Sequence, residues 1–376
     1  MLNPLKSSTA PAVSRLMRTP RTLDIEITAH CNLNCSYCYF FNNPAVDNRE
    51  LPAEEWLKFF DELGSLSVMN VTLAGGEPFV REDLSELLEG IVRNRMRFSL
   101  LSNATLIDDE IAAFIADTHR CDYIQVSVDG SCAEVHDSCR GKGAFEGMLR
   151  GIQTLQRHRI NTAVRVTIHQ NNVHDLENIA HFLLVELGLP GFSTNSAGYL
   201  GTCRLNANDV MLTNAERQLA METLLHLAEK YPGRISAEAG PLAEGHTWRR
   251  MEDARAHNAP AFPNGEYLTA CGCPGSKISV RADGTIVPCS MLAHSELGKI
   301  NRDSLAEIWQ NSPALNQLRN RRTTLLAGFE FCKGCSYIRY CTGNCPGLAY
   351  TLTGQVDHPS PDACLRRFLE EGGTIV

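Results

Sequence analysis

The segment TAHCNLNCSYC, residues 28–38, directly follows the short apolar run Leu23–Thr28, which has the pattern of a β-strand. It places Cys31, Cys35 and Cys38 in a C-x3-C-x2-C arrangement on one tight loop. Three thiolates at this spacing can bind three irons of a cubane cluster and leave the fourth iron without a protein ligand. An open metal position is a place for chemistry, by the logic that separates catalytic from structural zinc sites. The alternative is a zinc knuckle completed by His30 or by a distant residue.

Beyond this loop, the composition is that of an ordinary globular protein. The 376 residues are 43% hydrophobic and 21% charged, with a net charge of -8, which excludes a disordered or fibrous chain and argues against a general surface for nucleic acid or anionic lipid. No apolar run approaches the roughly 18 residues of a membrane span, and residues 1–21 contain no apolar signal segment. We therefore expect a cytoplasmic protein with neither nucleic acid nor membrane as a partner.

Cysteine is unusually frequent, with 15 residues. Because nothing indicates export and the cytosol keeps thiols reduced, metal binding is a better explanation than disulfides. Four cysteines are scattered and are interpreted as small buried or loop thiols: Cys121, Cys132, Cys139 and Cys203. The others form two groups, the loop already described and a C-terminal set made of Cys271, Cys273, Cys289, Cys332, Cys335, Cys341, Cys345 and Cys364.

Strand-like runs alternate with helical patterns from Leu23 to about Ser196. The predicted strands are Leu23–Thr28, Asn70–Ala74, Arg97–Leu101, Tyr123–Val128, Ala163–Ile168 and Gly191–Thr194. Such a succession of βα units predicts a parallel sheet. A doubly wound sheet and a partial barrel fit this periodicity equally well.

The remainder of the chain is predicted to be less regular. We expect a helix over Thr213–Tyr231, a polar linker over Arg234–Gly265, and a two-residue hairpin turn at Asp283-Gly284 within Ile278–Val287. Short helices are expected at Ser304–Gln310 and Pro313–Arg319, followed by a cysteine-dense end with too few apolar residues for a core. The predicted divisions are a polar tail (1–20), a barrel (21–200), a helical bridge or linker (201–265) and a cysteine-rich domain (266–376).

The first cysteine motif resembles the signature of the radical S-adenosylmethionine (SAM) superfamily, with Tyr37 in its aromatic position. The second strand is followed by Gly75-Gly76-Glu77-Pro78, similar to the family's motif for the methionine amino group of SAM. The resemblance implies a partial (β/α)6 barrel, with ligands at the carboxyl ends of the strands. It also makes the polar residues near these ends candidates for SAM binding: Asn103, Ser127, Arg140 and, less directly, Arg165 in the fifth strand.

The C-terminal cysteines resemble a SPASM domain, the auxiliary-cluster extension of many radical SAM enzymes. Cys332, Cys335, Cys341 and Cys345 follow C-x2-C-x5-C-x3-C, with Cys364 beyond them. Eight thiols could ligate two four-iron clusters, although two structural zinc sites are the alternative. The resemblance assigns Cys332, Cys335, Cys341 and Cys364 to an outer cluster and Cys271, Cys273, Cys289 and Cys345 to an inner one. The short Cys271-x-Cys273 spacing departs from many relatives, which leaves full ligation of the inner cluster open.

The resemblance implies three [4Fe-4S] clusters and reductive cleavage of SAM to a 5′-deoxyadenosyl radical, which removes a hydrogen atom from a substrate. We expect oxidation or crosslinking of a ribosomally made peptide or protein. The alternatives are oxidation or decarboxylation of a small molecule or tetrapyrrole and, outside enzymes, a zinc-stabilised binding protein. The regions around Cys38–Pro44 and Leu73–Phe79 are also similar to SynChlorMet-type cassette peptide maturases. No acid or base can be assigned; Asn195, Ser196 and Tyr199 are position-based substrate candidates.

The resemblance also implies partners. A flavodoxin or ferredoxin is the expected electron donor. Only a short polar tail precedes the strand before Cys31, so a peptide leader would be held by a separate recognition protein, by Thr213–Gly265 or by the C-terminal domain.

Overall fold

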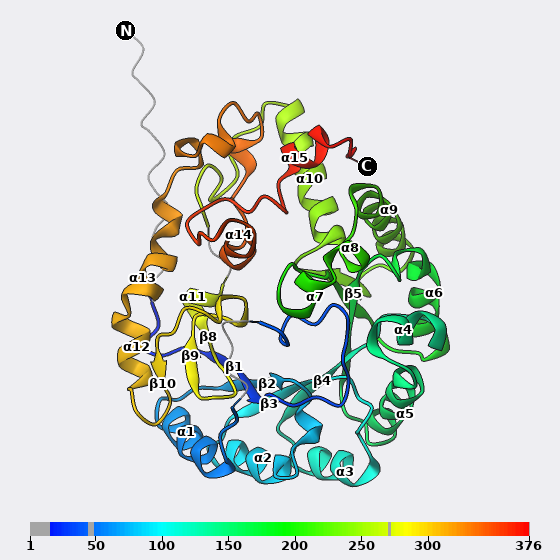
Figure 1. Ribbon diagram of the computed structural model, residues 1–376, viewed down its shortest axis with the longest axis vertical. Helices are drawn as coiled ribbons and strands as arrows, with labels where there is room; N and C mark the ends of the chain where they lie inside the picture. The colour runs from blue at the N-terminus through cyan, green and yellow to red at the C-terminus, as the bar shows by residue number, and fades with distance from the viewer. Residues whose placement is uncertain (1–15, 44–48, 270–271, 376) are drawn as a thin grey trace.

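Six parallel strands, in chain order, form the centre of the computed structural model, which describes residues 16–43, 49–269 and 272–375. Helices α1, α2, α3, α5 and α6 lie in turn around the outer side of this curved sheet, with α4 between α5 and α6 in this view (Figure 1). The strands are β1 (Thr22–Thr28), β2 (Asn70–Gly75), β3 (Arg97–Ser102), β4 (Cys121–Ser127), β5 (Thr162–Ile168) and β6 (Phe192–Ser196). The helices are α1 (Ala53–Ser65), α2 (Leu84–Arg93), α3 (Asp109–Asp117), α4 (Ala133–Arg140), α5 (Ala144–Arg157) and α6 (Leu176–His181).

Alternating side chains explain why these strands curve around a lumen. In β1, Leu23, Ile25 and Ile27 are fully buried on the helix-covered side and belong to the main apolar core. In β5, the residues between the buried ones are half-buried, and two of them, Arg165 and Thr167, are polar. A two-residue period therefore separates an apolar outer face from a polar inner face.

The C-terminal third extends the same sheet. Strand β8 (Lys277–Val280) pairs in parallel with β1, and β9 (Thr285–Val287) and β10 (Gly298–Lys299) continue the sheet outward. At the opposite edge, β7 (Ile235–Ala237) pairs with β6. The predicted partial barrel with a cysteine-rich C-terminal domain is confirmed, and the doubly wound alternative is excluded.

The hairpin turn differs in length from the prediction. Arg281 N–H donates to the Thr285 carbonyl at 2.9 Å, so three residues, 282–284, form the loop. Gly284 has a φ of 77°, the left-handed conformation that glycine adopts without steric cost. The Asp-Gly pair therefore marks the hairpin correctly but not its two-residue form.

The predicted polar linker Arg234–Gly265 is wrong. It contains β7 and the helix α10 (Pro241–Ala256), which packs against α9 (Asn214–Lys230). Trp248 and Met251 of α10 are buried in a small apolar cluster with Met221 of α9. The helix was not predicted because this stretch is mostly polar. Only a few of its side chains pack against another element.

The prediction that the C-terminal end lacks a core is also wrong in part. Tyr337, Tyr340, Leu365 and Phe368 complete the same apolar cluster, and the rings of Trp248 and Phe368 lie 4.8 Å apart. The remaining α-helices of the described residues are α7 (Gly201–Leu205), α8 (Ala207–Val210), α11 (Cys273–Ser276), α12 (Leu305–Asn311), α13 (Pro313–Asn320), α14 (Pro346–Thr353) and α15 (Leu365–Glu370).

Candidate active site

The loop after β1 holds Cys31, Cys35 and Cys38 together. Its backbone is fixed by Ser36, whose N–H donates to the Cys139 carbonyl at 2.9 Å, and by a turn in which Cys38 N–H donates to the Cys35 carbonyl. Burial raises the pKa of all three thiols, to about 11 for Cys35, and neighbouring thiolates raise the pKa of Cys35 further. Bound metal would displace these protons. Three clustered thiols therefore fit a cluster bound through three cysteines.

Gly75 and Gly76 let the turn after β2 approach this loop. Gly76 N–H donates to the Thr28 carbonyl, and Glu77 N–H donates to the His30 carbonyl at 2.8 Å. A Cβ atom on Gly76 would lie 1.9 Å from the His30 oxygen, and one on Gly75 would lie 2.2 Å from the Thr28 oxygen. The sequence interpretation gave these glycines a close approach to a ligand. In the structure they approach the backbone at the start of the cysteine loop.

The Glu77 carboxylate joins the ends of two strands. It accepts from Ser102 Oγ at 2.8 Å, from Asn103 N–H at 2.7 Å and from Phe79 N–H at 3.3 Å, and it is 1% exposed. Burial raises its pKa to about 7 although these bonds act in the opposite direction. Pro78, also buried, begins the short 3-10 turn η1 (Pro78–Val80).

Asn103 connects the end of β3 to the cysteine loop. Its Nδ2 donates to Asn32 Oδ1 at 2.9 Å and lies 3.9 Å from Cys31 Sγ, while its Oδ1 accepts from the Thr105 N–H. The predicted SAM ligand Asn103 therefore lies beside the first thiol of the motif.

A buried ion pair supports Tyr37. The Tyr37 hydroxyl and Arg140 Nε both donate to Asp129, and Thr167 N–H donates to its other oxygen at 2.8 Å. The Tyr37 ring also stacks on His169 at 5.3 Å. Burial by itself raises the pKa of Asp129, but Arg140 and the hydrogen bond from Tyr37 bring it below its usual value. Arg140, predicted as a SAM contact, is thus the partner of a fully buried carboxylate.

Sequence reasoning missed Asp129 and the surroundings of His169. Asp129 is fully buried and receives donors from the cysteine loop, α4 and β5, which no local pattern could indicate. Neither ring nitrogen of His169 has a hydrogen-bond partner among the described residues, and burial lowers its pKa to about 4. A neutral His169 adds no second positive charge beside Arg140.

Polar side chains line the barrel lumen. Arg165 Nη2 donates to Gln125 Oε1 at 3.3 Å, and Ser127 lies opposite Arg165 in the strand register. Lys277 Nζ lies 2.9 Å from Asp24 Oδ2. Tyr123 in β4 lies close enough to Arg165 in β5 and to Lys277 in β8 to act electrostatically on the pKa of each.

Several polar atoms on the lumen side, Glu26 Oε2 and Ser279 Oγ among them, are buried without a hydrogen-bond partner in the part of the chain that the structure describes, and two of these atoms lie on neighbouring strands. They are the donor Arg165 Nε and the acceptor Asn195 Oδ1. Thr167 of β5 lies opposite Asn195 of β6, so the two strands bring the donor and the acceptor into the same region. The position-based candidates Ser196 and Tyr199 follow Asn195 at the end of β6.

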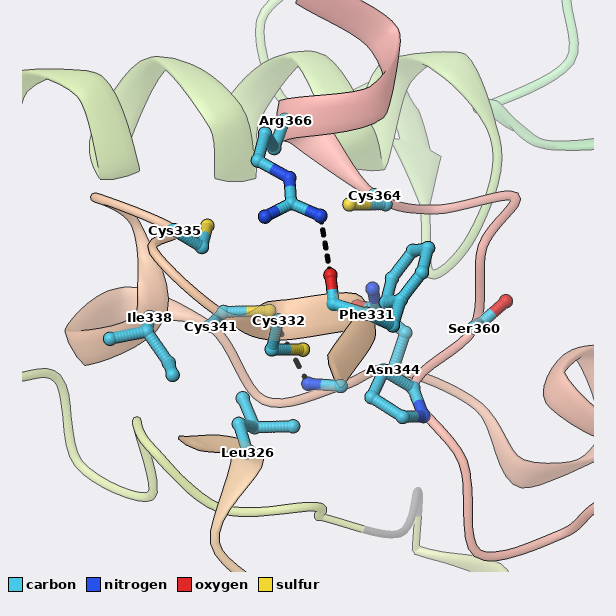
Figure 2. A pocket seen from close by; sticks show the side chains of 12 residues that line it. Leu326, Phe331, Cys332, Cys335, Ile338, Cys341, Asn344, Ser360, Cys364 and Arg366 are labelled. Carbon is cyan, nitrogen blue, oxygen red and sulfur yellow. Dashed lines mark hydrogen bonds between the residues drawn. The ribbon is translucent and has the colours of Figure 1, made fainter. Parts of the chain in front are cut away.

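Four C-terminal thiols line one pocket, as Figure 2 shows: Cys332, Cys335, Cys341 and Cys364. Leu326, Phe331 and Ile338 provide apolar walls. Burial, together with the other three thiolates, raises the pKa of Cys332 to about 12. Mutually close thiols in an apolar pocket fit a cluster with four cysteine ligands.

The other C-terminal thiols lie nearer the barrel. Cys289 precedes the 3-10 turn η4 (Ser290–Leu292), and Cys345 precedes α14. A Cβ on Gly347 would lie 2.6 Å from the Met291 Cβ and 3.6 Å from Cys345 Sγ, so these two segments are in contact. Cys273 begins α11, and Cys271 lies outside the described residues.

Tyr39 connects the two regions electrostatically. Burial raises the pKa of its phenol, and charge on Cys38 and on Cys289 raises it further. Cys289 of the C-terminal set and Cys38 of the first cysteine loop therefore both lie near Tyr39.

Comparison with known families matches this geometry. The Radical SAM superfamily model matches residues 25–183, and the iron-sulfur cluster-binding domain SPASM matches residues 271–336. The protein is a radical SAM enzyme with a SPASM domain, as the two cysteine motifs predicted. Iron–sulfur clusters and SAM binding follow from this membership. In the part of the chain that the structure describes, no helix is long and apolar enough to cross a membrane.

Among individual proteins, the chain is similar to an Fe-coproporphyrin III synthase of Methanosarcina barkeri, with 28% identity over 90% of this chain and 86% of that protein. It is also similar to mycofactocin maturase MftC of Mycolicibacterium smegmatis, with 26% identity over 93% and 83% of the two chains. Streptococcus suis SuiB, bound to its precursor peptide SuiA, shares the fold with a TM-score of 0.70. This match has 15% identity and covers 93% of this chain and 77% of SuiB.

Proposed function

We propose that this enzyme cleaves SAM reductively and uses the resulting radical to oxidise or crosslink a ribosomally made peptide. The iron–sulfur centres held by the cysteines, together with SAM, would supply one-electron reduction and a radical that can take a hydrogen atom from the substrate. The net change in the substrate would be the loss of two hydrogen atoms, one taken as a hydrogen atom and the other leaving as a proton and an electron, with an auxiliary centre as the electron acceptor. The protein would contribute binding, orientation and exclusion of water.

Three centres are proposed. Cys31, Cys35 and Cys38 would hold the SAM-binding cluster. Cys332, Cys335, Cys341 and Cys364 would hold the outer auxiliary cluster, and the remaining C-terminal cysteines, Cys271, Cys273, Cys289 and Cys345, the inner one. Tyr37, the Gly75–Pro78 turn, Asn103, Ser127, Arg140 and Arg165 would form the SAM site around the first cluster.

The polar lumen is the observation that carries the choice of a peptide. A peptide backbone offers both donors and acceptors, which suits a polar lumen where Asn195 Oδ1 and Ser279 Oγ have no partner among the described residues. A large planar tetrapyrrole would instead need broad apolar walls. The relatives named as the PqqA peptide cyclase and as MftC support the same choice.

A small-molecule reaction is the second candidate. Two Methanosarcina barkeri relatives, each 28% identical, are named as Fe-coproporphyrin III synthase and AdoMet-dependent heme synthase. A tetrapyrrole is therefore the competing substrate class, and Fe-coproporphyrin III, which the first name gives as a product, is the tetrapyrrole chosen to probe it.

Anaerobic incubation with SAM and dithionite tests the proposal. A candidate precursor peptide, taken from a neighbouring short reading frame, should lose mass equal to two hydrogen atoms, while Fe-coproporphyrin III should remain unchanged. Replacing Cys31, Cys35 and Cys38 together by Ala should abolish 5′-deoxyadenosine formation. Cys132→Ala, at an exposed thiol, is the control and should retain activity. Conversion of the porphyrin alone would contradict the peptide assignment.

Cluster number is tested separately by iron and sulfide analysis. Three four-iron clusters imply about 12 irons per chain, and replacing Cys332 and Cys335 by Ala should remove about four of them. An iron content unaffected by that change would contradict the outer ligand set.

The electron donor and the peptide-recognition partner are part of this proposal. A flavodoxin or ferredoxin would deliver electrons, and a separate protein would hold the peptide leader. Pull-down with the precursor peptide, with and without candidate proteins from the same gene cluster, tests the second point.

A further inference from the structure

Arg366 places a guanidinium group over the outer cysteine pocket (Figure 2). Its Nη2 donates to the Phe331 carbonyl, and its Nη1 donates to the Lys333 carbonyl at 3.0 Å. These two carbonyls flank Cys332, and Arg366 itself follows Cys364 by two residues. One side chain therefore joins the two segments that carry Cys332 and Cys364.

The same contacts fix where the positive charge lies. The Arg366 Cζ lies 5.8 Å from the Phe331 ring centroid, which adds a cation–π contact. The carboxylate nearest to it, Glu370 Oε1, is 3.6 Å away on a side chain that is 66% exposed, compared with 27% for Arg366. Solvent screens the electrostatic effect of the exposed carboxylate more than that of the sheltered guanidinium. A net positive charge therefore remains directed at the thiols.

We propose that Arg366 is a positioning residue that raises the reduction potential of the outer auxiliary cluster. This inference rests on the proposed ligands Cys332, Cys335, Cys341 and Cys364. Reduction adds one electron and no proton to such a centre, which makes it more negative by one charge. A fixed cation close by favours that form, and arginine stays protonated at any working pH. A cluster that is easier to reduce is a better acceptor for the electron released by substrate oxidation.

Redox titration followed by electron paramagnetic resonance tests this role. The Cys31, Cys35 and Cys38 to Ala variant serves as the background, and the signal lost on further replacing Cys332 and Cys335 by Ala identifies the outer cluster. In this background, Arg366→Gln should lower the ratio of reduced to oxidised outer cluster at fixed potential about tenfold, which is about 59 mV for a one-electron couple.

Two variants separate the charge from the contacts. Arg366→Lys keeps the charge and should stay within about threefold of the unsubstituted ratio. Arg367→Gln is the matched control, because Arg367 is 50% exposed and pairs with Glu371 at 2.7 Å. It should also stay within about threefold.

Several results would overturn the inference. One is an Arg366→Gln protein with full iron content and an unchanged potential, and another is an equal shift in Arg367→Gln. If the Arg366→Gln protein loses the outer cluster, the Arg366→Lys protein is used to test the proposal instead. An unchanged reduction potential in Arg366→Lys supports the proposal, and a shifted potential or a lost cluster rejects it. Absence of the outer cluster from the unsubstituted protein would instead contradict the ligand assignment on which the inference rests.

Discussion

Asp129 carries a negative charge in the interior of the protein, and the stability of the fold depends on its pairing with a buried positive charge. It is fully buried and neutralises Arg140, which is 6% exposed. Asp129→Asn would leave the Arg140 charge without its partner, and breaking a buried pair in this way costs on the order of 3 kcal/mol. We expect the free energy of unfolding, measured by urea denaturation under anaerobic conditions, to fall by about that amount.

Asp122 offers the matched control for this change. It pairs with Arg97, but the two side chains are 27% and 42% exposed. Asp122→Asn should cost less than about 1 kcal/mol because solvent screens the pair. Equal losses in the free energy of unfolding of the two variants would show that the buried Asp129 pair contributes no more stability than an exposed pair.

Gly76 tests how tightly the cysteine loop is held. Gly76→Ala would place a methyl group 1.9 Å from the His30 carbonyl, and a backbone oxygen cannot move aside as a flexible side chain does. We expect the loop to shift and the anaerobically reconstituted protein to lose about four irons per chain. Gly198→Ala, where no atom lies within 4 Å, is the control and should keep its iron. Normal iron content in Gly76→Ala would contradict this view of the turn.

These residues show what a sequence can and cannot predict. The cysteine motifs were recognisable because each is a local spacing, and the Gly75–Pro78 turn because it follows a strand. Asp129 and Arg366 were missed because their importance comes from partners that are distant in sequence or are backbone carbonyls. Arg140 was noticed, but its pairing with Asp129 could not be predicted from its neighbours.

At the scale of elements, the pairing of α9 with α10 gives a pH-dependent prediction. Glu244 of α10 lies 3.8 Å from Arg217 of α9, which also pairs with Asp362 at 2.7 Å. Burial raises the pKa of Glu244 from 4.5 to about 7, although Arg217 acts in the opposite direction. Between these values the folded protein holds a proton that the unfolded chain has lost. Its stability therefore decreases as the pH rises from about 4.5 to about 7.

Glu244→Gln should remove this decrease. At pH 4 the variant and the unsubstituted protein should be equally stable. At pH 8 the variant should be more stable by about 3 kcal/mol, and Arg217 should still pair with Asp362. Urea unfolding at the two pH values measures the difference. Glu222→Gln, at an exposed position of α9, should change neither value. A variant that is less stable at pH 8 would mean that the ion pair outweighs the cost of burial.

Most elements were predictable, and α10 was the main failure. The six barrel strands were found within a few residues because each is a short strand-like run that contains apolar residues and is separated from the next by a helical pattern. Helix α10 contributes only a few buried side chains, such as Trp248 and Met251, to a small cluster shared with α9 and the C-terminal end. A pattern this sparse resembles a polar connection until the partner surfaces are known.

For the whole molecule, the parallel pairing of β8 with β1 makes the barrel depend on the C-terminal third. A chain ending at Ala256 would leave one side of β1 unpaired, and an exposed strand edge favours aggregation. A chain ending at Asn320 keeps β8, β9 and β10 but lacks the outer cysteines, which makes it the matched control. We expect the first to aggregate and the second to stay monomeric in size-exclusion chromatography. A monomeric shorter chain would show that β1 does not need this partner.

The same pairing has a consequence during synthesis on the ribosome. Residues 22–25 emerge early, yet their partners at residues 277–280 appear only when most of the chain has been made. Contacts between such distant segments form slowly. In the nascent barrel, the first strand can therefore pair on only one side until residues 277–280 have been made. The adjoining cysteine loop cannot reach its final position before then. Maturation of the metal centres would then follow completion of the polypeptide, so that chaperones and cluster-delivery proteins would act on the released chain rather than on its growing N-terminal half.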